Sequence, residues 1–157
     1  MINIGDNIPE ATLKIMSENG PKSFETAVEF KDKKVVLFAV PGAFTPTCSA
    51  AHLPGFVVHY DKFIEAGVDT VACVSVNDAF VMNAWGLSAN AENIAMLGDG
   101  NATFAKALGL ELDASKFHMG IRSKRFALVI DNGIVTYLAV DESGLDKTSA
   151  EEVLKNL

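Results

Sequence analysis

The strongest constraint in this sequence is a cysteine placed where an apolar strand gives way to a helix. Residues 35–40 form a short apolar run ended by Pro41 and Gly42, which is typical of a buried strand that stops abruptly. The residues after Cys48 have the composition of a helix. Free backbone N–H groups and the positive end of the helix dipole favour a thiolate in a first helical turn. We therefore expect nucleophilic chemistry at Cys48.

The residues around this cysteine form a recognisable pattern. Pro41, Thr45 and Cys48 are spaced as P-x-x-x-T-x-x-C within the longer string PGAFTPTCSAAHLPGF. The run VACVSVNDAF at residues 71–80, the run IRSKRF at residues 121–126 and the opening IGDNIP accompany it. In this order the stretches resemble the peroxiredoxin family, and within it the type II, peroxiredoxin-5-like branch. The resemblance implies a thiol-dependent peroxidase that reduces hydrogen peroxide and alkyl hydroperoxides through a cysteine sulfenic acid.

The order of strands and helices predicts an α/β fold. Apolar, β-branched stretches predict strands at residues 35–40, 70–76, 94–99, 124–130 and 134–140. Asp131-Asn132-Gly133 joins the last two as a hairpin, because Asn-Gly accepts positive φ. Helical stretches separate the earlier strands, which indicates a central mixed β-sheet with helices on both faces. By resemblance this is a thioredoxin-like three-layer sandwich, which we expect to form a single domain over residues 1–157.

Three local signals predict where helices begin and bend. Ser23 is the expected N-cap of a short helix over residues 24–30. Asn77 or Asp78 is expected to cap the helix that follows the second strand. Pro54 should bend the helix that begins near Cys48, because proline lacks an N–H and clashes with the preceding turn.

Peroxide reduction by a thiol needs an ionised sulfur, an aligned O–O bond and stabilisation of charge on oxygen. The Thr45 hydroxyl is expected to accept from the peroxide and donate to the sulfur. Pro41 restricts the loop and shields the thiolate from water. The cation must come from elsewhere in the fold, and Arg122 and Arg125 are the two arginines of the chain. The residues alone leave that choice open; the resemblance assigns the active-site role to the arginine of the K-R-F segment, Arg125.

The second cysteine, Cys73, lies inside an apolar strand, where a packing role is expected. A disulfide with Cys48 would need the two Cα atoms to approach to about 6 Å. Some family members carry a resolving cysteine in a C-terminal loop, but residues 141–153 of this chain contain none. This departure from the family pattern favours an external reductant, glutathione and/or glutaredoxin, with thioredoxin as the alternative.

Two other functions compete with the peroxidase. One is a thioredoxin-fold redox sensor or binding module, in which Cys48 is oxidised to signal without turnover. Pro41, Thr45 and Arg125 weigh against it, because a binder needs no residues that orient a peroxide. The other is a cysteine hydrolase or transferase that uses His52, one turn after Cys48, but it requires an orienting third group that the sequence does not reveal. His52 is otherwise expected to orient the loop or the sulfur.

Charge and composition limit the partners. A net charge of -7 argues against nucleic acid and anionic membranes as main partners. Two separated cysteines without paired His or carboxylate spacing predict no metal site, and no cofactor is expected. No stretch approaches membrane-spanning length, and the N-terminus lacks the features of a secretory signal. We expect a cytoplasmic protein; an organellar form whose presequence has been removed is the alternative.

A homodimer is expected, with the active-site loops near the contact. Phe44 lies beside the nucleophile, Phe80 and Trp85 lie on a predicted helix, and Phe117 lies on an irregular segment. Aromatic residues of this kind are either plain core or the centre of an interface. The resemblance favours the interface, because type II relatives tend to pair through this end of the fold.

Overall fold

The computed structural model describes residues 1–157, and its centre is a seven-stranded sheet. The strands are β1 (Thr12–Ser17), β2 (Gly20–Glu25), β3 (Lys34–Ala39), β4 (Thr70–Ser75), β5 (Ala95–Gly98), β8 (Arg125–Asp131) and β9 (Ile134–Asp141). Their order across the sheet is β2-β1-β5-β4-β3-β8-β9. β3, β4 and β5 are parallel, whereas β8 and β9 extend one side in antiparallel pairing and β1 and β2 extend the other.

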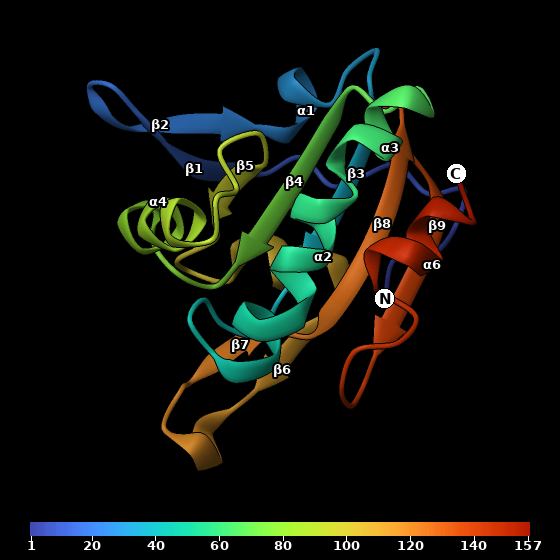
Figure 1. Cartoon of the computed structure of the whole chain (residues 1–157). Helices are drawn as coiled ribbons and strands as arrows, with labels where there is room; N and C mark the ends of the chain where they lie inside the picture. The colour runs from blue at the N-terminus through green and yellow to red at the C-terminus, as the bar shows by residue number, and fades with distance from the viewer.

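Helices cover both faces of this sheet. The helices are α1 (Thr26–Glu29), α2 (Leu53–Val58), α3 (Tyr60–Glu65), α4 (Ala79–Ser88), α5 (Thr103–Leu108) and α6 (Ala150–Leu154). In Figure 1, α2, α3 and α6 lie in front of the sheet, and their buried residues share one hydrophobic cluster with α4. α5 packs into a second cluster on the opposite face, together with the N-terminal segment. The expected thioredoxin-like sandwich, a central mixed sheet with helices on both faces, is confirmed.

Successive residues of β3 alternate between these two clusters. Val36 and Phe38 belong to one cluster, whereas Val35 and Leu37 belong to the other, and all four are fully buried. Side chains of a strand point to opposite faces in turn, so a strand buried on both faces is apolar throughout. This explains why the strand before the active-site loop is an unbroken apolar run.

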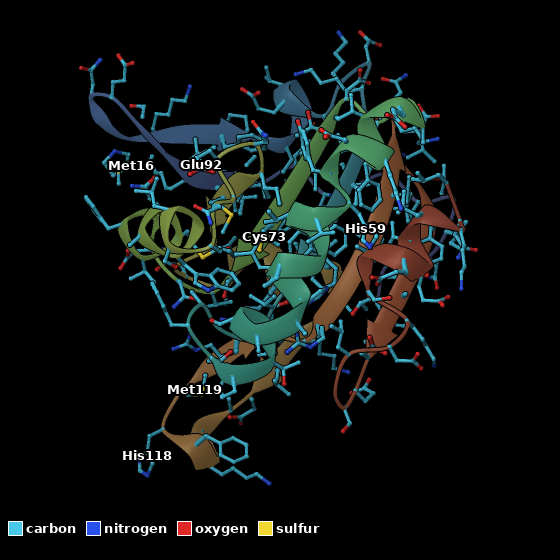
Figure 2. All side chains as sticks on the ribbon, in the orientation of Figure 1. Met16, His59, Cys73, Glu92, His118 and Met119 are labelled. Carbon is cyan, nitrogen blue, oxygen red and sulfur yellow. The ribbon has the colours of Figure 1, made fainter.

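The segment between α5 and β8 forms a projecting arm. β6 (Glu111–Asp113) and β7 (Ile121–Ser123) pair as a separate two-stranded sheet, with a short 3₁₀ helix (Ser115–Phe117) between them. The arm extends away from the central sheet at the bottom of Figure 1. Figure 2 shows His118 and Met119 on this arm.

The expectation that Ser23 caps a helix is wrong. Ser23 lies in β2, where it pairs with Lys14 of β1, and α1 begins only after Glu25. The neighbouring pair explains the difference, because Leu13 and Phe24 lie opposite each other and are both buried. Burial of this cross-strand pair outweighs the local preference for a cap.

The helical segment after the active-site loop also differs from the expectation. It opens with a π-helical turn (Cys48–His52), in which the Cys48 carbonyl accepts from the Leu53 N–H. Pro54 follows this turn directly within a continuous helical segment, so its missing N–H removes one helical hydrogen bond at the place where the π-helical turn passes into α2. A second irregularity follows at His59, between α2 and α3.

Two other signals are confirmed. Asp78 is the N-cap of α4, and its side chain accepts from the Val81 N–H at 2.8 Å. Asn132 and Gly133 both have positive φ in the turn between β8 and β9, as a tight hairpin requires.

Candidate active site

Cys48 lies at the carboxyl ends of the parallel strands, buried to 1% exposure. The loop that leads to it is fastened to the end of β4. Asn77 Oδ1 accepts from the Ala43 N–H at 3.1 Å and from the Ser75 hydroxyl at 2.6 Å. On the other side of the cysteine, Trp85 Nε1 donates to Ser49 Oγ at 3.0 Å. The sulfur is therefore held from both flanks by β4 and α4.

The loop itself is tightly packed around Gly42. The Thr45 hydroxyl donates to the Gly42 carbonyl at 2.6 Å. A Cβ at Gly42 would lie 3.0 Å from Thr45 Cγ2 and 3.4 Å from Met119 Cε. Thr45 has committed its proton to Gly42, so its hydroxyl faces a ligand as an acceptor and does not donate to the sulfur.

Arg125 supplies the cation at the sulfur. It is the first residue of β8, and its Nη2 donates to Cys48 Sγ at 3.2 Å. Its Nη1 lies 2.7 Å from Nδ1 of His52. The guanidinium is buried, so its positive charge acts on the sulfur with little screening by water.

Arg122 points elsewhere. Its Nε donates to the Met119 carbonyl at 2.8 Å, and its Nη1 donates to the Val76 carbonyl at 3.1 Å. The first bond lies within the arm, and the second joins the arm to the residue after β4. The geometry therefore brings Arg125, and not Arg122, to Cys48.

Pro41 and Arg125 line a cavity of about 110 Å³ beside the site. Its other walls include Leu112 of the arm and the charged pair Lys124 and Glu142, whose Nζ and Oε1 are 3.3 Å apart. A small opening with one apolar wall and one charged rim thus adjoins the arginine.

His52 is buried beside Arg125. Burial first, and then the positive charge of Arg125, lower the pKa of His52 from 6.5 to about 3. The imidazole is therefore neutral across the physiological range. Its Nε2 lies 3.0 Å from the Thr148 carbonyl, so Nε2 carries the proton and Nδ1 accepts from Arg125.

Cys73 is fully buried in β4 and forms no disulfide. Burial first, and then a charge on Cys48, raise its pKa well above the usual value. Figure 2 shows Cys73 in the interior, and it packs in the same cluster as Leu53 and Phe56 of α2. A thiol buried in this way stays protonated and is therefore unreactive.

A family model, a curated relative and two solved structures match this chain over nearly its whole length. The chain matches the Redoxin family over residues 3–154. It is 47% identical to peroxiredoxin-2E-2, chloroplastic, of Oryza sativa subsp. japonica, over 99% of this chain and 72% of the relative. The crystal structure of reduced Prx3 from Vibrio vulnificus in complex with hydrogen peroxide has a TM-score of 0.96 and 52% identity, covering 99% of this chain and 98% of that one. Peroxiredoxin 5 from Alvinella pompejana has a TM-score of 0.88 and 37% identity, covering 99% and 97% of the two chains.

The chain belongs to the peroxiredoxin family. Identity at this level over nearly the whole chain confirms the resemblance on which the sequence interpretation rests. As a peroxiredoxin it is a thiol peroxidase: it reduces a peroxide and is returned to the thiol by a reductant. None of its helices has the length and apolar character needed to span a membrane.

The sequence interpretation left one part of the site incomplete. His52 was weighed as a group that orients the loop or the sulfur, whereas in the structure it contacts Arg125. The sequence does not predict the role of Asp141, which holds the loop that carries Thr148. The sequence signal for this role is an aspartate at the end of an apolar strand, followed by a loop that contains Ser143 and Gly144.

Proposed function

We propose that Cys48 is the peroxidatic thiol and that Thr45, Arg125 and Pro41 complete the catalytic site. The observation that carries this proposal is the bond from Arg125 Nη2 to Cys48 Sγ at 3.2 Å. A permanently charged guanidinium against the sulfur stabilises the thiolate, which is the nucleophilic form.

The reaction follows from this arrangement. The thiolate attacks one peroxide oxygen, an S–O bond forms, and the O–O bond breaks. Cys48 becomes a sulfenic acid, and the departing oxygen takes a proton from water to leave as water or an alcohol. Arg125 stabilises the negative charge that develops between sulfur and oxygen, while the Thr45 hydroxyl accepts from the peroxide O–H. Pro41 limits water around the sulfur.

The proposed substrates are hydrogen peroxide and alkyl hydroperoxides. The Prx3 structure from Vibrio vulnificus was solved in complex with hydrogen peroxide, and it is 52% identical to this chain. The cavity beside Pro41 and Arg125 has an apolar wall at Leu112, which favours acceptance of a small alkyl group.

Glutathione and/or glutaredoxin are the proposed reductants. Cys73 has its thiol buried in the core, and residues 141–153 hold no cysteine to resolve the sulfenic acid. An incoming thiol would condense with the sulfenic acid to give a mixed disulfide and water. A second thiol would then release Cys48. Thioredoxin is the alternative reductant.

A redox sensor without turnover is the second candidate function. It would also use a cysteine that forms a sulfenic acid. The Thr45 and Arg125 arrangement argues for turnover, because a sensor that only signals needs no group placed to accept from a peroxide. Steady consumption of peroxide with excess glutathione distinguishes the two.

The proposed assembly is a homodimer that pairs through the active-site end. Phe44, Phe80 and Phe117 are each more than half exposed, which is unusual for aromatic residues near a catalytic loop. Trp85 does not belong to this exposed surface, because it is buried in its own chain at 1% exposure.

The proposed location is the cytoplasm. A buried free thiol and a reductant-dependent Cys48 suit a reducing compartment. The rice relative is named as chloroplastic, so fractionation of the native protein is the test of this proposal.

The proposed function is tested by measuring peroxide consumption by wild type, Cys73→Ser and Cys48→Ser. Wild type and Cys73→Ser should consume peroxide with glutathione, glutathione plus glutaredoxin, or thioredoxin compared side by side. Cys48→Ser should be inactive with every reductant while remaining folded by circular dichroism. Activity in Cys48→Ser, or equal loss in Cys73→Ser, would show that the nucleophile is assigned to the wrong residue.

A further inference from the structure

The active-site arginine is held by a chain of hydrogen bonds that begins far from the sulfur. Arg125 and Asp141 lie opposite each other on β8 and β9. The Asp141 carboxylate accepts from the backbone N–H groups of Asp146, Lys147 and Thr148, and from the Thr148 hydroxyl, at 2.7–3.1 Å. It therefore fixes the loop between β9 and α6.

That loop presents one carbonyl to the active site. The Thr148 residue is fully buried, and its carbonyl meets Nε2 of His52 at 3.0 Å. A carbonyl oxygen accepts only, so it selects the tautomer of His52 that carries its proton on Nε2. The other ring nitrogen, Nδ1, is then a lone-pair acceptor.

The acceptor on His52 orients the guanidinium. Arg125 Nη1 lies 2.7 Å from Nδ1, and Nη2 of the same planar group donates to Cys48 Sγ at 3.2 Å. Because the guanidinium is planar and rigid, a hydrogen bond that fixes Nη1 also fixes the direction in which Nη2 points. Since the imidazole is neutral, the whole positive charge of Arg125 remains available to the sulfur, which a carboxylate in this place would partly neutralise.

We propose that Asp141, the Thr148 carbonyl and His52 form a positioning relay that aims Arg125 at Cys48. His52 and Asp141 are positioning residues in this scheme, because they act on the sulfur through Arg125 and make no hydrogen bond to Cys48 Sγ themselves. The C-terminal loop thus contributes to the peroxidase reaction through the backbone of Thr148. The relay rests on the proposed role of Cys48, and the tests below separate the two.

The surroundings of His52 leave no competing partner for its ring nitrogens. The charged or titratable groups near it are Arg125 from β8, Asp141 from β9 and Cys48 from its own helical segment. Its faces pack against Phe38 and Phe56, with ring centroids 5.0 and 5.7 Å away. Burial and the arginine charge keep its pKa low, which preserves the acceptor at Nδ1 over the working pH range.

A double-mutant cycle tests the relay directly. His52→Leu should slow the oxidation of Cys48 by about 10–100-fold, the usual effect of losing a group that orients a functional one. In an Arg125→Ala background the same change should have no further effect, because His52 acts through the arginine. Oxidation is followed by stopped-flow fluorescence of Trp85, the single tryptophan, which is bonded to the residue after Cys48. If the fold-losses in rate of the two single variants multiply in the double variant, His52 and Arg125 act independently, and the relay is overturned.

Conservative variants separate positioning from packing. His52→Gln retains a donor for the Thr148 carbonyl and an acceptor for Arg125, so it should recover most of the rate lost in His52→Leu. Asp141→Asn should also slow the oxidation of Cys48. The Asn side chain has one acceptor oxygen, so it cannot accept all four hydrogen bonds that the Asp141 carboxylate accepts from the loop. His59→Leu is the matched control, since His59 contacts Glu151 of α6 but not the arginine; Figure 2 shows it near α6. Equal losses in His52→Leu and His59→Leu would indicate loss of helix packing and overturn the proposal.

A measurement on the unmodified protein needs neither turnover nor a folded variant. With ¹⁵N-labelled histidine, His52 should show a protonated Nε2 and an unprotonated Nδ1 from about pH 5 to 8. A His52 that titrates in this range, or that carries its proton on Nδ1, would overturn the relay. Cys48→Ser examines the proposed function alone, because its inactivity does not depend on the tautomer of His52.

Discussion

Arg125 Nη2 lies 3.2 Å from Cys48 Sγ, although the two residues are 77 positions apart in the sequence. The antiparallel pairing of β3 with β8 brings them together, because Ala39 at the end of β3 lies opposite Phe126 at the start of β8. The loop that follows β3 therefore begins next to Arg125. The pairing of strands in the sheet, and not the local sequence, places the Arg125 guanidinium next to the sulfur.

Removing this cation should slow the chemical step more than removing the other arginine. Arg125→Ala is expected to reduce the rate constant for Cys48 oxidation by about 10²-fold or more, the usual effect of losing one transition-state donor. Arg122→Ala should have a smaller effect, because its guanidinium bonds to the Met119 and Val76 carbonyls. Stopped-flow Trp85 fluorescence measures both rates. A larger loss in Arg122→Ala would reverse the assignment.

The local parts of the site were predictable because they are local. Pro41 and Thr45 lie in the loop that leads to Cys48, and the pattern of apolar residues predicts the strand before this loop and the helix after it. The choice between Arg122 and Arg125 depended on the resemblance, because only the register of β8 decides which side chain faces the sulfur. Sequence spacing carries no information on such pairings across the sheet.

The remaining errors have the same origin. β1 and β2 were missed because their pairing depends on the buried contact of Leu13 with Phe24 and not on strand-like composition. Trp85 was placed at an interface, whereas it is buried and donates to Ser49. In both cases the sequence is compatible with two placements, and tertiary packing determines which of them the chain adopts.

The buried neutral His52 should make the protein less stable in mild acid. Its pKa is about 3 in the folded chain against an ordinary value of 6.5. Between these values the unfolded chain binds a proton that the folded chain does not, so stability falls as pH drops below about 6.5. Each pH unit is worth about 1.4 kcal/mol, giving a loss of about 2 kcal/mol between about pH 6.5 and 5.

Urea unfolding at a series of pH values measures this dependence. His52→Gln does not titrate and should lose this part of the slope, so the difference between the two proteins isolates the histidine. Asp141 makes its own contribution at lower pH, because hydrogen bonds outweigh burial and lower the pKa of its carboxyl below 3.8. Parallel pH profiles for wild type and His52→Gln would mean that folding does not lower the pKa of His52.

Glutathione should add to the oxidised protein at Cys48. The structure supports this because Cys73 is buried in the core and the loop after β9 has no cysteine. After one equivalent of peroxide, added glutathione should give an intact mass larger by one glutathionyl group, and peptide mapping should place it on Cys48. Cys73→Ser is the matched control and should behave identically. A stable Cys48–Cys73 disulfide that excludes glutathione would restore a thioredoxin-type cycle.

The exposed aromatic residues at the active-site end should bury themselves against a second copy of the chain. Phe80 is 63% exposed on α4 and Phe117 is 66% exposed on the arm, so neither contributes much to the core of its own chain. Wild type at micromolar concentration should sediment at about twice the chain mass of 16.7 kDa. Phe80→Asp should shift it toward monomer, because a carboxylate would be desolvated at the contact.

The matched control for this dimer is Val58→Asp. Val58 is 75% exposed on α2, so the substitution adds the same charge to an apolar surface position outside the proposed contact. Val58→Asp should therefore remain dimeric. Phe44, 56% exposed on the loop before Cys48, would be covered in the dimer, so slower Cys48 oxidation in Phe80→Asp alone would show that the partner supports the loop. A wild type that stays monomeric at high concentration would refute the dimer, and equal dissociation of both variants would refute its location.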